Sequence, residues 1–147
     1  MQCMGSYAMP ESILKHKEAA ITFALDKARK QFSELQDIYR TALPRVDPVL
    51  INDLLGREMT ATAEKPLSYT IEVFTRKGID TEAARNYIYQ KTGKMPSVHD
   101  NGTHYVTTQN LTLEMLKEIS DSDDVVDIRG SYCGGIGMQA AYYEQRQ

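Results

Sequence analysis

Val98-His99-Asp100-Asn101-Gly102-Thr103-His104-Tyr105 predicts a β-hairpin, because Asn-Gly readily supplies the two positive φ angles of a type I′ turn. Asp100 and Thr103 would flank a turn centred on Asn101-Gly102, and His99 would face His104 as the next cross-strand pair. Such partners have Cβ atoms about 5 Å apart on one face of a sheet. The hairpin therefore places two of the three histidines of the chain side by side.

The sequence on either side of this hairpin predicts two more strands and two helices. Alternation of apolar and polar residues from Leu67 to Val73 is typical of a half-buried strand. Asp80 caps a helix that extends to about Thr92, Thr112 caps another, and a last strand covers 125–128. With the hairpin at about 95–108, the order is βαββαβ, which indicates an α+β ferredoxin-like sandwich with both helices on one face of an antiparallel sheet.

A long helix is predicted from about Pro10 to Leu43, since proline suits the first helical position and Pro44 stops propagation. Its apolar residues recur at alternating spacings of four and three, which is the pattern of a coiled-coil seam. The apolar face is wider than a simple seam and its flanks carry few charges, so packing between chains and packing within one chain both fit. The seam consists of Ile21, Leu25, Ala28, Phe32, Leu35, Tyr39 and Ala42, of which Leu25, Phe32, Leu35 and Tyr39 are predicted interaction residues.

A second, short helix is predicted between Asp47 as N-cap and Gly56 as stop, folded back on the long helix as a helical hairpin. The expected organisation is a helical assembly segment (10–56), a linker (57–66), the ferredoxin-like domain (67–132) and a flexible glycine-rich tail (133–147). Tyr142 and Tyr143 near the end of that tail are predicted to dock on a partner.

Composition places the chain among soluble globular proteins. It has 147 residues, 41% hydrophobic and 25% charged, and no apolar stretch approaches the roughly 20 residues of a membrane span. The start, MQCMGSYAMPES, has neither a basic nor an apolar signal region, so we expect a cytoplasmic protein. The net charge of −3 argues against general nucleic-acid binding, and two distant cysteines argue against a disulfide framework or a structural zinc site. No cofactor is predicted.

His99 and His104 are the candidate metal ligands, although a stable site needs a third or fourth ligand. The same pair would repel when both rings are protonated, which predicts a pH response, and a polar hairpin tip without further role is the third interpretation. The sequence leaves open which hairpin face is buried. If Val98 and Tyr105 face the helices, the histidines lie on the open face beside Met95 and Val106, and that face is a predicted protein-binding surface.

Three further motifs carry little chemistry. The acidic turn at 121–124, with Asp127 just after it, lacks the spacing of an EF-hand, and because carboxylates after a helix C-terminus are disfavoured, we expect compensating groups near it. Residues 135–140 match a GxGxxA fingerprint, but the remaining chain is too short for the helix and strand that must follow. Cys133 lacks an activating base at a recognisable spacing.

Several regulatory, metal-binding and inhibitory modules share the βαββαβ plan, including ACT-like domains and the propeptide inhibitors of subtilisin-type proteases. The propeptides are the closer resemblance: Tyr69-Thr70-Ile71-Glu72-Val73 is similar to their opening strand, and Leu111 to Tyr132 is similar to their last helix, acidic turn, strand and exit. This resemblance implies a protease inhibitor or intramolecular chaperone that offers residues 129–135 to an enzyme cleft.

Three functional hypotheses follow. The preferred one is a non-enzymatic interaction or regulatory protein that self-associates through its N-terminal helix and presents a sheet face or tail to a protein partner. The alternatives are the propeptide-like inhibitor and a metal-dependent enzyme that uses His99 and His104.

Overall fold

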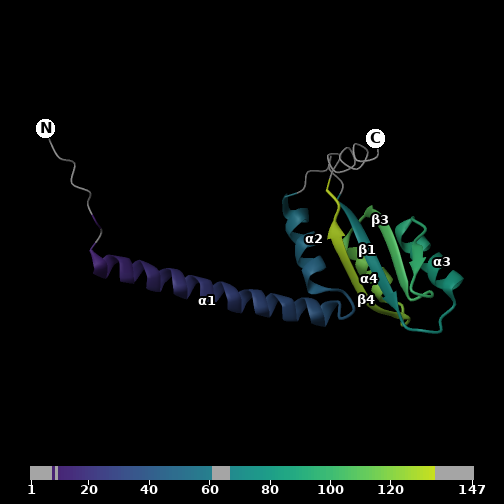
Figure 1. Cartoon of the computed structure of the whole chain (residues 1–147), viewed down its shortest axis with the longest axis horizontal. Helices are drawn as coiled ribbons and strands as arrows, with labels where there is room; N and C mark the ends of the chain where they lie inside the picture. The colour runs from purple at the N-terminus through teal and green to yellow at the C-terminus, as the bar shows by residue number, and fades with distance from the viewer. Residues whose placement is uncertain (1–7, 9, 61–66, 135–147) are drawn as a thin grey trace. The chain divides into compact units, whose positions relative to one another are not determined.

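The computed structural model describes residue 8, residues 10–60 and residues 67–134 of the chain, which divides into two compact units, 1–38 and 39–147 (Figure 1). The described part of the first unit is dominated by one helix. The second contains a four-stranded antiparallel sheet with helices. The elements are α1 (Glu11–Ala42), α2 (Pro48–Thr60), β1 (Ser68–Thr75), α3 (Thr81–Thr92), β2 (Ser97–His99), β3 (His104–Asn110), α4 (Leu113–Ser120) and β4 (Val125–Tyr132).

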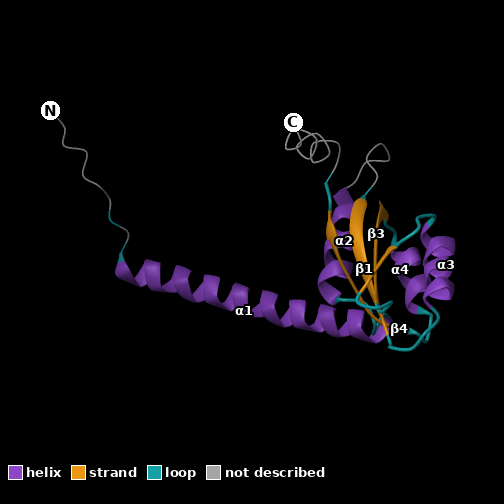
Figure 2. Cartoon of the chain, turned by 45° about the vertical axis from the view of Figure 1, so that its right-hand side comes forward, coloured by secondary structure: helices purple, strands orange, loops and turns teal. Residues whose placement is uncertain are grey.

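The sheet has the strand order β2-β3-β1-β4, and every neighbouring pair is antiparallel. Figure 2 shows the strands as one continuous layer. Along residues 68–132 the elements follow one another as predicted, and the α+β class is confirmed.

The predicted caps of two helices are confirmed. The Asp80 carboxylate accepts hydrogen bonds from the backbone amides of Glu82 and Ala83, which have no partner within the helix. Gly93 ends α3 with a φ of 73°, a left-handed conformation that suits glycine. The hydroxyl of Thr112 accepts from the amide of Met115 at the start of α4.

One core joins the sheet to the helices of the second unit. It includes alternate residues of β1, together with side chains from β3, β4, α2, α3 and α4. The largest fully buried members are Tyr69, Tyr105, Leu50, Ile51, Leu54, Ile71, Ile88, Leu116, Ile119, Ile128 and Val73. Figure 1 shows α4 behind the sheet, so the opposite sheet face is turned away from it.

The short helix α2 differs from the prediction in length. It continues through Gly56 to Thr60, one turn beyond the expected stop, and the Arg57 guanidinium contacts the Asp53 carboxylate one turn earlier at 2.9 Å. Leu50, Ile51 and Leu54 pack into the core of the second unit, so α2 is part of that unit. None of the helices in the described ranges is long and apolar enough to cross a membrane.

The hairpin turn lies one residue earlier than predicted. His99 pairs with His104 as expected, but the amide of Gly102 donates to the carbonyl of His99 at 3.1 Å, so the central residues are Asp100 and Asn101. Their φ values of 52° and 57° have the sign that a type I′ turn requires. Aspartate tolerates this conformation better than most residues, which allows the shift.

Candidate functional site

The open sheet face consists of the strand side chains that alternate with the buried ones. Tyr105 is fully buried and Val98 packs against the core, so the hairpin buries this pair and leaves its histidines on the other face. The buried hairpin face, which the sequence left open, is therefore the face of Val98 and Tyr105. The open sheet face comprises Ser68, Thr70, Glu72, Phe74, Ser97, His99, His104, Val106, Thr108, Asn110, Asp127, Arg129 and Ser131.

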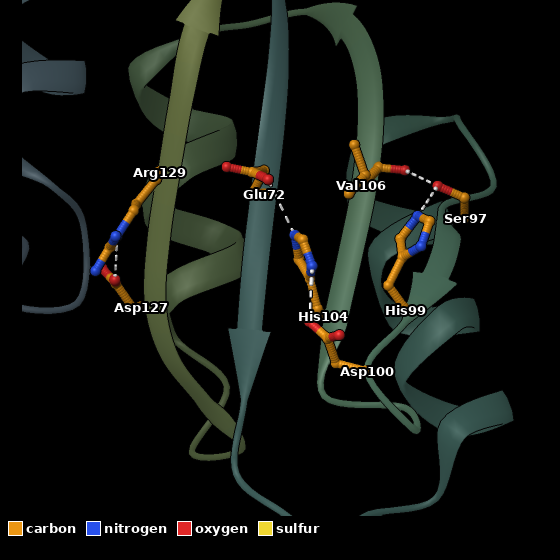
Figure 3. A network of polar contacts seen from close by, with 8 residues as sticks. All are labelled: Glu72, Ser97, His99, Asp100, His104, Val106, Asp127 and Arg129. Atoms are coloured by element: carbon orange, nitrogen blue, oxygen red, sulfur yellow. Dashed lines mark hydrogen bonds and ion pairs between the residues drawn. The ribbon is translucent and has the colours of Figure 1, made fainter.

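His104 lies at the centre of a polar network on this face (Figure 3). Its Nε2 lies 3.1 Å from the Glu72 carboxylate and its Nδ1 lies 3.3 Å from that of Asp100. The ring stacks on Phe74 with centroids 4.5 Å apart, and only 16% of the side chain is exposed. A neutral imidazole donates from one nitrogen only, so both carboxylates are satisfied together when the ring is protonated.

His99 has different partners. Its ring lies 5.5 Å from that of His104, centroid to centroid, and its Nε2 contacts the Ser97 hydroxyl at 3.1 Å. That hydroxyl also faces the carbonyl of Val106 (Figure 3). The two histidines are neighbours, as predicted, but they contact different groups: His104 contacts two carboxylates and His99 contacts a hydroxyl.

The metal hypothesis gains no support from this geometry. Throughout the described ranges, no group of three or more histidine, cysteine, aspartate or glutamate side chains is arranged to hold a metal ion. The two nitrogens of His104 contact carboxylates on opposite sides of the ring, and His99 contacts a hydroxyl. A metal site at His99 and His104 therefore stays a prediction.

A second ion pair lies on β4. Arg129 Nε donates to the Asp127 carboxylate at 2.7 Å, and its guanidinium carbon lies 5.6 Å from the centre of the Phe74 ring. The hydrogen bond to Asp127 raises the pKa of Arg129. None of Glu72, Phe74, Asp127 and Arg129 was predicted to lie on the face of the histidines, although a period of two along each strand would have placed Glu72 and Phe74 there.

Cys133 lies next to this face, and among the described residues its contacts are with a hydroxyl and a carbonyl. Its Sγ contacts the hydroxyl of Thr70 at 3.0 Å and lies 3.8 Å from the carbonyl of Ser131. A hydroxyl and a carbonyl do not withdraw the thiol proton as a histidine would. This arrangement offers no support for nucleophilic catalysis.

The predicted compensation of the acidic turn is confirmed. Arg45 donates to the carbonyl of Ser120 at 3.0 Å and to that of Ser122, and its guanidinium lies 3.5 Å from the carboxylate of Asp123. Arg76 contacts Asp124 at 2.7 Å. These cations balance both the negative end of α4 and the carboxylates that follow it.

The first unit presents the other candidate surface. Every residue from 11 to 35 is exposed. The exposed seam is defined here as the large apolar side chains that follow the four-three spacing: Leu14 (45% exposed), Ile21 (60%), Leu25 (52%), Phe32 (49%) and Leu35 (37%). The exposed seam includes three of the predicted interaction residues and extends one heptad further towards the N-terminus than predicted.

The remaining predicted interaction residues have different environments. Tyr39 is buried in the core of the second unit, and its hydroxyl lies 3.4 Å from the Asn52 side chain, so it is not offered to a partner. Met95 is 50% exposed and Val106 is half-buried on the open sheet face. Tyr142 and Tyr143 lie outside the described residues, as does most of the predicted tail.

The fold and the two surfaces define a class: an α+β protein with an antiparallel sheet and an exposed amphipathic helix. Comparison with models of known families, with curated proteins and with solved structures gives no match in any of the three.

Proposed function

We propose that this protein is a non-enzymatic interaction module that self-associates through α1 and presents its open sheet face to a protein partner. The observation that carries the proposal is the exposed seam: five large apolar side chains at coiled-coil spacing, in a segment where every residue from 11 to 35 is exposed. A partner that covers the exposed seam would remove these side chains from water.

The energetics of an isolated helix support this proposal. Single helices in water gain little from backbone hydrogen bonding alone, and most helical stability in proteins comes from packing of an apolar face. Exposed ion pairs within one helix, such as Arg29 with Asp26, contribute only about 0.3–0.5 kcal/mol each. Full burial of one leucine or phenylalanine contributes about 1.5–3 kcal/mol, so covering several residues of the exposed seam has the larger effect.

The second half of the proposal concerns the open sheet face. We assign the second unit to the ferredoxin-like class, supported by its βαββαβ order and its sheet order β2-β3-β1-β4. On the open sheet face Glu72 contacts His104 and Asp127 pairs with Arg129, whereas Met95, two residues before β2, is half exposed. Ion pairs around apolar groups suit recognition of a protein surface better than bond-making chemistry.

The test is the mass of the intact chain in solution, measured by light scattering at micromolar concentration. We expect an oligomer, and we expect Leu25→Gln, Phe32→Gln and Leu35→Gln together to shift it to monomer. Phe23→Gln is the matched control, because Phe23 is 72% exposed and lies outside the four-three spacing. A monomeric parent chain, or a triple variant with unchanged mass, would refute self-association through α1.

A further inference from the structure

We propose that α1 pairs with α1 of a second copy as an antiparallel two-stranded coiled coil whose two-fold axis passes between Asp26 and Lys27. This inference rests on the proposed self-association and specifies the partner and its direction. In coiled-coil notation, the seam places Leu14, Ile21, Ala28 and Leu35 at d positions, and Glu18, Leu25 and Phe32 at a positions.

A parallel pair would set unfavourable residues against each other. In a parallel, in-register homodimer, each seam residue faces its own copy, so Glu18 would face Glu18 within the seam. Two like charges removed from water repel one another strongly. Phe32 would also face Phe32 directly beside a layer in which Ala28 faces Ala28, which crowds one layer and leaves a gap in the next.

The antiparallel pair avoids facing Glu18 side chains and facing Phe32 side chains. With the axis between residues 26 and 27, Phe32 faces Ile21 of the second copy and Leu25 faces its Ala28. Glu18 faces Leu35 of the second copy, so no carboxylate faces another in the seam. Each layer then combines one a and one d residue, and the volumes are more even along the pair.

The flanking positions accept this arrangement. Thr22 would lie diagonally beside Arg29 of the second copy on one flank, and Ala24 diagonally beside its Gln31 on the other, so neither contact brings two like charges together. The register matches residues 15–38 of the two copies end to end, which covers the exposed seam from Ile21 to Leu35 and leaves Leu14 outside the pair. Because the pair has two-fold symmetry, both copies contribute the same surface to the interface.

Distance measurement between spin labels tests direction and register. The full chain with Cys3→Ser and Cys133→Ser would be labelled at Ser12→Cys, which is exposed and outside the seam. In the antiparallel pair the two labelled positions lie about 29 residues apart along the helices, or about 43 Å at 1.5 Å per residue. Lys27→Cys is the control, because it lies beside the axis and gives a short distance in either direction.

The outcomes separate the two proposals. A dimer with a long Ser12 distance near the expected value and a short Lys27 distance supports the antiparallel pair. A dimer in which both distances are short is parallel and overturns the inference while leaving self-association intact. A monomer by light scattering overturns self-association itself, and a trimer or tetramer overturns the two-stranded arrangement.

A charge exchange provides a second test without labels. Ile21→Glu and Phe32→Lys should each weaken the dimer, because each sets a charge against an apolar residue. Combined, they face one another as Glu–Lys pairs in the antiparallel dimer, so the double variant should dimerise more tightly than either single variant. In a parallel dimer the same double variant sets like charges together and should be weaker than both, which would overturn the inference.

Discussion

The hydroxyl of Tyr69 donates a 2.6 Å hydrogen bond to the carboxylate of Asp53, and this bond joins the central strand β1 to α2. Arg57 contacts the same carboxylate at 2.9 Å and stacks over the Tyr132 ring, with 3.6 Å between the guanidinium carbon and the ring centre. Tyr132 in turn meets Tyr69 edge to face at 5.4 Å. The four side chains attach α2 to the sheet at the end of β4.

We expect Tyr69→Phe to destabilise the second unit by about 1–2 kcal/mol, because hydrogen bonds to charged groups contribute more than neutral ones and the aromatic packing is retained. The measurement is urea unfolding at one fixed protein concentration. Tyr89→Phe is the control, since Tyr89 is 48% exposed on α3. Equal effects of the two substitutions would contradict a stabilising role for the bond.

The same contact predicts a dependence of stability on pH. Burial alone would raise the pKa of Asp53, but hydrogen bonds from Tyr69 and Arg57, together with the charge of Arg57, outweigh it and lower the pKa below its usual 3.8. A lowered pKa in the folded state stabilises the fold above the unfolded value, and this contribution is lost as the pH falls through the folded pKa.

Asp53→Asn should therefore lose less stability than the parent chain as the pH falls from about 5 to below the folded pKa of Asp53. Unfolding free energies measured in urea at a series of pH values would show this difference between the parent chain and Asp53→Asn. The difference should be smaller when both chains also carry Tyr69→Phe. If stability depended on pH identically in the parent chain and in Asp53→Asn, the pKa of Asp53 would not be lowered in the folded state.

Local sequence signals predicted the helices and strands well, but they did not predict contacts between residues far apart in the sequence. The His99–His104 pairing followed from strand alternation around a turn, but the turn shifted because Asp100 can also adopt positive φ. Tyr39 continues the heptad spacing yet is buried in the second unit, since a repeat along one helix does not reveal where the globular unit begins. The bond from Tyr69 to Asp53 spans 16 positions and has no sequence signature.

Replacement by alanine should change the stability of the fold in opposite directions at Gly102 and Gly56. Gly102 has a φ of 84°, and a Cβ there would collide with the Thr81 hydroxyl, so Gly102→Ala should destabilise the fold by more than about 1 kcal/mol. Gly56 lies within α2 with open space around it, so Gly56→Ala should stabilise the fold by about 0.5–1 kcal/mol. Thermal unfolding of both variants at matched concentration checks the signs, and a stabilised Gly102→Ala would contradict the turn geometry.

Arg45 and Arg76 both contact the acidic turn, but we expect them to contribute unequally. Arg45 donates to backbone carbonyls at and after the end of α4, and its side chain is 35% exposed, whereas Arg76 is 65% exposed and pairs with a carboxylate. The Ser120 carbonyl at the end of α4 lacks a partner within the helix, so removing Arg45 leaves it unsatisfied, whereas the Ser122 carbonyl keeps its bond from the Val125 amide. Exposed ion pairs contribute about 0–1 kcal/mol. Arg45→Ala should therefore cost about 1–3 kcal/mol and Arg76→Ala less than about 1 kcal/mol.

Urea unfolding in low and high salt distinguishes the two arginines further, because salt should weaken the Arg76 contribution more strongly. Equal losses that disappear together in high salt would show that Arg45 acts only through the charges of the turn.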